Sequence, residues 1–213
     1  MMEQGSIAWH EARLGKVTAS NFAKAIARVR SGDGFSETAN SYMYELIGER
    51  LTGQWEEVTS KALEWGKEWE PVARKTYASR FAVEVEQVPF VALLDDTLQG
   101  FVGASPDGIL SDGATLEIKC PLTYREHARA LVTRKMPVAH RAQVQGQMWV
   151  CGSGRATFVS FHPAYRKPHD LVVVDVPRDD KYIDETLAPR ITEFVDRLNA
   201  ECARFINDQI VSS

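Results

Sequence analysis

The pattern of apolar and polar positions predicts that the chain begins with helices and continues with strands. Three helices are expected in the first eighty residues, at 18–29, 37–52 and 60–80. Apolar runs rich in β-forming residues follow at 83–94, 98–105 and 114–120. Asp112 and Gly113 stand between two such runs and are typical of a hairpin turn.

The rest of the chain mixes the two kinds of element. The stretch "TYRE", from Thr123 to Glu126, has the form of a capping box and should open a helix. Another helix is expected at about 138–151, strands at 155–161 and 171–177, and a long helix towards the C-terminal end. This order predicts an α/β or α+β protein whose central mixed sheet carries helices on both faces.

The chain shows no internal repeat, no low-complexity tract and no convincing linker, so we expect one domain over residues 1–213. The stretch "RSGDGFSET", from Arg30 to Thr38, is typical of a surface loop with a helix start at Ser36. A hydrophobic fraction of 44% over 213 residues is enough to bury a full core.

Charge and cysteine content narrow the kinds of protein that this sequence could encode. The formal net charge of −4 excludes a globally basic nucleic-acid binder, so any anion site must be local. The three scattered cysteines, Cys120, Cys151 and Cys202, contain no CxxC pair and indicate reduced, intracellular thiols. The polar start "MMEQGSIAWH" lacks a secretory signal, and no apolar run approaches the length of a membrane span.

The stretch "GASPDGILSDGATLEIKCP", from Gly103 to Pro121, contains the most informative chemistry. Side chains alternate along a strand, so Glu117 and Lys119 point to one face of the predicted sheet. Asp107 lies in the turn on the neighbouring hairpin arm and can come beside Glu117. Two converging carboxylates repel each other, and a divalent cation such as Mg²⁺ relieves that repulsion. A lysine on the same face can act on water or on a phosphoryl group.

Each fragment of this pattern also has an ordinary explanation. A Glu-x-Lys pair on a strand is usually a solvated ion pair, and Pro-Asp-Gly is a common turn. The combination is more specific, because a turn acid, a hairpin turn and Glu-x-Lys stand in order between apolar neighbours. The combination therefore favours a catalytic site.

The same residues resemble the PD-(D/E)xK nuclease signature, and "SPDG…LEIKCP" is similar to its form in phage-lambda-type alkaline exonucleases, the YqaJ-like viral recombinase family. Three more motifs of that family have counterparts in order along the chain. They are "AWHEARLGKVTAS" (Ala8–Ser20), "KALEWGKEWE" (Lys61–Glu70) and "AQVQGQMWV" (Ala142–Val150). The resemblance extends from about Trp9 to about Val176.

The resemblance implies a restriction-endonuclease-like core and a Mg²⁺-dependent exonuclease of phage recombination. Such enzymes degrade the 5′-phosphorylated strand of duplex DNA from an end and leave a 3′ overhang. It also implies ring-shaped homotrimers, a single-strand annealing protein as partner, no membrane association, and the bacterial cytoplasm as the location of a phage or prophage protein.

The resemblance further assigns two Mg²⁺ ions to the site, with Mn²⁺ as an expected substitute. One ion would lie between Asp107, Glu117 and the backbone carbonyl of Ile118. The second would share Asp107 and the scissile phosphate, and Lys119 would orient or deprotonate the attacking water. Glu70 would approach the metals and Gln143 the attacked phosphate, although Pro71 directly after Glu70 suggests that its helix kinks or restarts there.

A 5′-phosphate pocket is implied at Arg13, Ser20 and Ser105, and its chemistry is plausible because a guanidinium grips phosphate bidentately. Leu63 matches a position that wedges the DNA end, but it could equally be a core leucine. The basic residues Lys24, Arg28 and Arg30 contact DNA or form a solvated helix face, and the segment from Arg125 to Arg141 could line the DNA path.

Two alternatives to an exonuclease remain open. The first is a PD-(D/E)xK endonuclease or junction resolvase, for which a 5′-phosphate pocket would have no obvious use. The second is a non-catalytic DNA-end-binding module, against which the intact Asp107, Glu117 and Lys119 argue.

Overall fold

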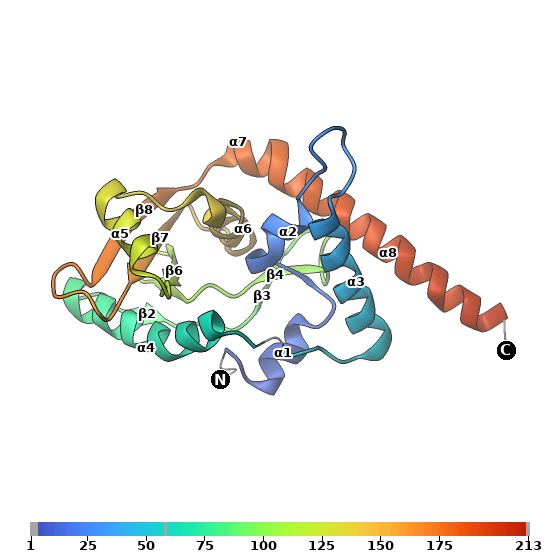
Figure 1. The fold of residues 1–213 in the computed structure, drawn as a ribbon. Coiled ribbons are helices and arrows are strands. Elements are labelled where there is room, and N and C mark those ends of the chain that lie inside the picture. Colours follow the sequence, from blue (N-terminus) through green and yellow to red (C-terminus); the bar gives the residue numbers. More distant parts are fainter. Residues whose placement is uncertain (1–3, 58, 212–213) are drawn as a thin grey trace.

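The structure, a computed structural model that describes residues 4–57 and 59–211 with side chains as far as Phe205, contains a five-stranded mixed sheet in its described part (Figure 1). The strand order is β2-β5-β6-β7-β8, with β6 and β7 parallel and the other neighbours antiparallel. The bounds are β2 Val85–Glu86, β5 Gly108–Leu110, β6 Thr115–Lys119, β7 Arg155–Phe161 and β8 Leu171–Pro177. The predicted mixed sheet is therefore confirmed.

A second, three-stranded sheet lies beside the first. It consists of β1 (Val17–Thr18), β4 (Val102–Ala104) and β3 (Val91–Ala92) in the order β1-β4-β3. β4 of this sheet and β5 of the larger sheet are joined by Ser105, Pro106 and Asp107. The turn that contains the candidate acid Asp107 is therefore the connection between the two sheets.

Helices cover both faces of the larger sheet, as the sequence predicts (Figure 1). On one face, Leu116 and Ile118 of β6 pack with Ala73 and Tyr77 of α4 (Lys61–Phe81). On the opposite face lie α5 (Tyr124–Thr133) and α6 (Arg141–Cys151), the latter preceded by a 3₁₀ turn at Val138–His140. Alternation along β6 therefore directs Glu117 and Lys119 towards α6 and not into the α4 interface.

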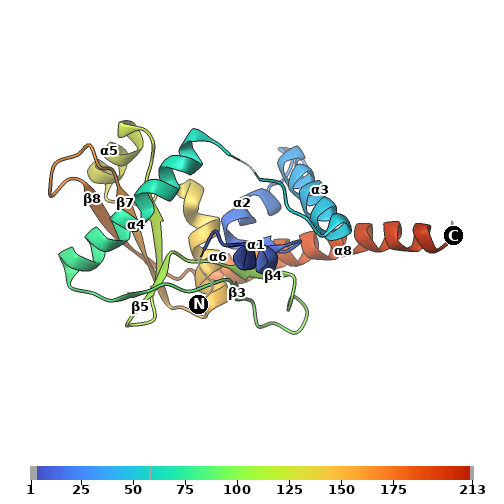
Figure 2. The same cartoon turned by 90° about the horizontal axis from the view of Figure 1, so that it is seen from below.

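The other end of the molecule is helical. Its core unites α2 (Phe22–Ala25), α3 (Glu37–Thr52) and α8 (Ala188–Val211), which follows α7 (Asp180–Tyr182) and a π-helical turn at Ile183–Leu187. Ser36 caps α3 by accepting a hydrogen bond from the Ala39 amide, and Gly53 ends it with φ of 68°. α8 extends away from the rest of the molecule (Figures 1 and 2).

The expected helix at 18–29 is wrong. A helix α1 (Ile7–Arg13) comes earlier, and the segment after it forms β1, a 3₁₀ turn (Ala19–Asn21) and the short α2. β1 forms because Val17 donates its amide hydrogen to the Phe101 carbonyl at 2.8 Å and because the strand pairs with β4. This partner is about eighty-five residues away, and local periodicity cannot reveal it.

Two further expectations need correction in detail. The apolar run 83–94 does not form one strand, because β2 joins the larger sheet and β3 the smaller one. α5 begins at Tyr124 as predicted, but the Thr123 side chain forms no capping hydrogen bond there.

The three cysteines are free thiols, and no helix in the described ranges has the length and apolar character needed to cross a membrane.

Close contact between α6 and α2 depends on Gly146. A Cβ atom at this position would lie 2.3 Å from the Phe22 ring and 3.6 Å from the Cβ of Ala19. Only a residue without a side chain therefore lets α6 approach the segment that follows β1.

Candidate active site

Asp107 is anchored at the junction of the two sheets. Its Oδ2 accepts a hydrogen bond from the Ile118 amide at 2.6 Å, and its own amide donates to the Leu116 carbonyl at 2.9 Å. The residue is 9% exposed. Burial, followed by the charges of Glu117 and Glu70, raises the pKa of Asp107 well above its usual value. The protein thus holds this carboxyl where an anion is disfavoured.

Glu117 is 1% exposed and receives three side-chain hydrogen-bond donors. Lys119 Nζ lies 2.6 Å and Gln143 Nε2 2.7 Å from Oε1, while Gln147 Nε2 lies 2.6 Å from Oε2. These donors hold the Glu117 side chain in one orientation, since a buried polar group needs hydrogen-bond partners from the protein once water is excluded.

Lys119 is an ammonium in this arrangement. Burial acts to lower the pKa of Lys119, but Glu117 and Asp107 act in the opposite direction and the net pKa is raised. Lys119 therefore supplies positive charge beside the two acids at neutral pH.

Glu70 reaches the same place from α4. The helix continues through Pro71, so the expected kink or restart after Glu70 does not interrupt it. Burial raises the pKa of Glu70, Arg74 opposes this rise, and the charge of Glu117 adds to it. We call the group of Glu70, Asp107, Glu117 and Lys119 the acid cluster.

The acid cluster fits a hard divalent ion. Carboxylate oxygens are the ligands that such an ion prefers. Burial, together with repulsion from Glu117 and Glu70, raises the pKa of Asp107, and a bound cation would remove the repulsion. Residues 4–57 and 59–211 contain no group of three or more His, Cys, Asp or Glu side chains that could hold a metal ion by themselves.

A second group of polar residues surrounds Arg13 at the end of α1. Its Nη1 donates to Ser105 Oγ at 3.1 Å, and its Nη2 lies 3.4 Å from both Thr18 Oγ1 and Ser20 Oγ. The Trp9 ring lies 4.0 Å from the guanidinium, and the Trp9 indole also donates to Ser105. We call these five residues the arginine pocket.

Arg13 forms no ion pair with a carboxylate in the described part of the chain, and burial lowers its pKa, although Tyr42 and Glu49 oppose the shift. A partly buried guanidinium surrounded by neutral hydroxyls is a site with unbalanced positive charge, which suits an anion. The structure thus brings together the predicted residues Arg13, Ser20 and Ser105.

The remaining residues that were predicted to contact DNA differ in their exposure and in their partners within the protein. Leu63 is 47% exposed in the first turn of α4, which excludes a core role. Lys24 and Arg30 are exposed. Arg28 is bound to Glu193 at 2.5 Å and stacks on Phe35, which favours a structural role. In the basic segment, Arg141 pairs with Asp179 at 2.7 Å.

Sequence reasoning did not assign a role to three residues that contact the predicted site residues. Gln147 contacts Glu117 together with Gln143, and the four-residue spacing of the two glutamines could have indicated this. The same spacing joins Arg74 to Glu70. The contact between Trp9 and Ser105 spans ninety-six residues, and no local signal marks it.

Comparison with known proteins agrees with this geometry. The YqaJ-like viral recombinase domain matches residues 8–154. An alkaline exonuclease from Laribacter hongkongensis superposes with a TM-score of 0.86 at 31% identity, covering 98% of this chain and 100% of that one. The same enzyme in complex with dAMP gives a TM-score of 0.87.

Two more distant relatives were found. A phage-related exonuclease from Haemophilus somnus shares the fold, with a TM-score of 0.65 at 18% identity over 87% of this chain and 96% of that one. The alkaline nuclease of Autographa californica nuclear polyhedrosis virus is 29% identical over an alignment of 140 residues, and the match covers 50% of this chain. The match covers only 32% of that viral protein. With its domain match, its fold and the order of its motifs, this chain belongs to the YqaJ-like viral recombinase domain family.

Proposed function

We propose that the protein is a Mg²⁺-dependent exonuclease that degrades the 5′-phosphorylated strand of duplex DNA from an end and leaves a 3′ overhang. The observation that supports this most directly is the spacing of the two sites. Ser105 belongs to the arginine pocket and Asp107 to the acid cluster, and they are two residues apart in the chain.

Two residues of extended chain span at most about 7 Å. Successive phosphates of one DNA strand are about 3.4 Å apart along the axis. A terminal phosphate on Arg13 would therefore place a bond one or two nucleotides away beside Asp107. This spacing favours removal of short products from an end over cutting within a duplex.

In the proposed reaction, Asp107, Glu117 and the Ile118 carbonyl would hold the metal. When bound, Mg²⁺ would polarise the scissile phosphate and lower the pKa of a coordinated water. Glu117 is oriented by Lys119, Gln143 and Gln147.

Lys119 would stabilise negative charge that develops on the phosphoryl oxygens and would orient the attacking water. Gln143, from the first turn of α6, would lie beside the same phosphate. A second Mg²⁺ sharing Asp107 would complete a two-metal hydrolysis, and Mn²⁺ would substitute for it.

The family resemblance extends the proposal to the partner, the assembly and the cellular location of the enzyme. The 3′ overhang would be the substrate of a single-strand annealing protein in phage-type recombination, and the enzyme would act as a ring-shaped homotrimer in the bacterial cytoplasm. Light scattering of the purified protein tests the trimer, since a monomer's mass is 23.9 kDa.

The activity is tested with linear and covalently closed circular duplexes of one sequence, each incubated with Mg²⁺ or with EDTA. We expect loss of the linear duplex in Mg²⁺ only, with mono- or dinucleotides released from the 5′ end. Cleavage of the circle would support an endonuclease instead, and binding of ends without hydrolysis would support the non-catalytic alternative.

A further inference from the structure

Arg74 connects two parts of the acid cluster that come from different elements. Its Nε donates to the backbone carbonyl of Asp107 at 3.0 Å, and its Nη2 donates to Glu70 Oε1. Glu70 and Arg74 lie four residues apart on α4, so they share one side of that helix. One guanidinium therefore connects α4 to the turn between the two sheets.

The electrostatic setting explains why such a connection is needed. Without Arg74, Glu70 would lose its ion-pair partner and lie beside Glu117, while Lys119 is paired with Glu117. Burial and the charge of Glu117 both disfavour the anion of Glu70, and Arg74 is the leading influence in the other direction. Arg74 thus opposes the rise in the pKa of Glu70 and holds the Glu70 side chain by an ion pair.

The contact with Asp107 has a separate effect. The carboxylate and the amide of Asp107 are both tied to β6, through Ile118 and Leu116. Of these contacts, only the hydrogen bond from Arg74 joins the Asp107 carbonyl to α4. Loss of Arg74 would free the side of the turn that faces α4, while the hydrogen bonds to β6 remain.

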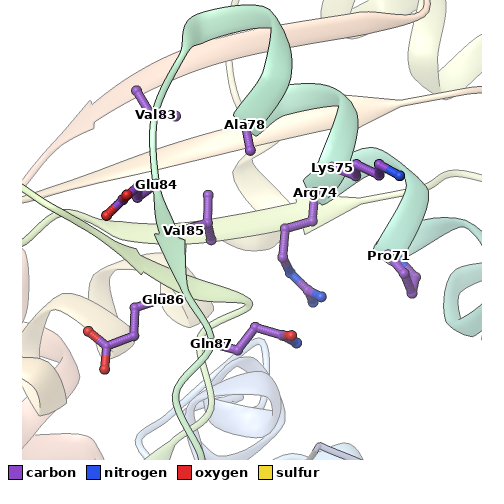
Figure 3. Close-up of a pocket in the computed structure, with 9 residues that line it drawn as sticks. All are labelled: Pro71, Arg74, Lys75, Ala78, Val83, Glu84, Val85, Glu86 and Gln87. Atoms are coloured by element: carbon purple, nitrogen blue, oxygen red, sulfur yellow. The ribbon is translucent and has the colours of Figure 1, made fainter.

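Arg74 also borders a groove on the outer side of the cluster (Figure 3). This groove, about 800 Å³ in volume, runs between α4 and the segment Val83–Gln87, and the Arg74 side chain extends across it from the helix. A shorter side chain at position 74 would widen a groove that already exists and would not open a sealed cavity. We therefore expect the folded state to tolerate substitution of Arg74.

We propose that Arg74 is a positioning residue of the active site, which holds Glu70 and the Asp107 turn at the separation that the catalytic metal requires. The inference rests on the proposed function and adds a residue to its site. Arg74 is assigned no contact with DNA. Its effect should therefore appear in the use of metal and in kcat, with little change in KM.

The same helix offers a matched control. Arg80 forms a bidentate ion pair with Asp170, with both distances 2.9 Å, at the far end of α4. Arg80→Met removes a comparable arginine–carboxylate pair from the same helix. It should lower the melting temperature but leave kcat and the half-saturating Mg²⁺ concentration unchanged.

The test compares Arg74→Met, Arg74→Lys, Glu70→Gln and the double variant Arg74→Met/Glu70→Gln on linear duplex DNA. We expect Arg74→Met to lower kcat about ten- to a hundredfold, the usual effect of misplaced catalytic groups, with KM within about twofold. Arg74→Lys should recover part of the loss, and the double variant should be no slower than the slower single variant.

A readout without DNA separates this inference from the proposed function. Mg²⁺ should raise the melting temperature of the wild-type protein, and Arg74→Met should need a higher Mg²⁺ concentration for the same rise. If the wild-type protein shows this rise but cleaves nothing, the proposed function fails and the role of Arg74 in metal binding stands. An unchanged Mg²⁺ response in Arg74→Met, a loss confined to KM, or additive effects with Glu70→Gln would each overturn the inference.

Discussion

The acid cluster and the arginine pocket are neighbours in the chain and opposites in charge. In the acid cluster, the charges of Glu117 and Glu70 act on Asp107, and the pKa of Asp107 is raised well above its usual value by burial and by these two acids. In the arginine pocket, Arg13 is partly buried among hydroxyls. One site has a surplus of negative charge and the other a surplus of positive charge.

Other partly buried arginines are paired with acids within the protein. Arg28 is bound to Glu193 and Arg80 to Asp170. The acid cluster and the arginine pocket instead each hold an excess of one sign of charge, which suits a metal cation and a phosphate respectively. Unbalanced charge costs stability in the absence of ligand and strengthens binding when the ligand arrives, as expected for functional sites.

The largest effect is expected for Asp107→Asn. Loss of this proposed metal ligand should lower Mg²⁺-dependent cleavage at least about a thousandfold, because the metal would supply most of the charge stabilisation. The same change removes a carboxylate from a repulsive site. We therefore expect the metal-free protein to gain about 0.5–2 kcal/mol of stability at neutral pH, measured by denaturant unfolding in EDTA.

The stability gain of Asp107→Asn should depend on pH. A carboxyl whose pKa is raised by folding contributes stability that is complete at low pH and is lost as the pH rises through the folded pKa. The advantage of Asp107→Asn should thus vanish below about pH 4, near the unfolded pKa, and grow towards neutrality. Asp112→Asn is the opposite control, because the Ala114 amide lowers the pKa of Asp112. A variant of Asp107 that is destabilised at neutral pH would contradict the repulsive picture.

Lys119→Ala tests the one cation inside the acid cluster. We expect kcat to fall about a hundred- to a thousandfold, since the ammonium matters most as charge develops on the phosphate. Affinity for duplex DNA, measured by fluorescence anisotropy, should change much less. Equal losses in affinity and rate would make Lys119 an ordinary phosphate contact.

Arg13→Ala tests the other site. Wild-type protein should degrade duplex with 5′-phosphate ends about ten- to a hundredfold faster than duplex with 5′-hydroxyl ends, the value of a charge-assisted bidentate contact. Arg13→Ala should remove this preference by slowing the phosphorylated substrate. Lys24→Ala should instead weaken binding to both substrates alike and reduce its salt dependence. If the wild-type protein degrades both substrates at the same rate, the arginine pocket has a function other than binding the terminal phosphate.

The smallest effect is expected for Gln147→Leu, which removes one of three donors from Glu117. A buried charged acceptor that loses one donor costs about 1–3 kcal/mol of stability, and we expect about a three- to tenfold loss in kcat. Gln145→Leu is the matched control on α6, since Gln145 bonds to Pro177 and Asp179 outside the cluster. It should lose stability without losing activity, and a similar loss of activity in both variants would exclude a specific role for Gln147.

The sequence could place Asp107, Glu117 and Lys119 beside one another because two strong local rules apply there. Alternation along a strand determines the common face of Glu117 and Lys119, and a turn signal marks Asp107. Helices α3 and α4 are also predicted almost to the residue. At Pro71, packing of α4 against the sheet prevails over the local preference of the preceding residue.

The arginine pocket could be located from residues only by resemblance. Its members come from α1, β1, the 3₁₀ turn and the Ser105 turn, and the pairing of β1 with β4 brings them together. Such pairing depends on a partner far along the chain, as does the contact of Arg74 with the Asp107 carbonyl. For this reason the expected helix at 18–29 was wrong, and only the contact of Arg74 with Glu70, four residues away on the same helix, had a local signal.

Gly146 has a consequence for how such proteins can vary. It lies on α6 between Gln143 and Gln147, which hold Glu117, and it touches Phe22 and Ala19, which flank Ser20. A single methyl group there would push the two glutamines away from Glu117 and Ser20 away from Arg13 together. Among relatives, positions 22 and 146 should therefore co-evolve, with a larger residue at one accepted only where the other is smaller.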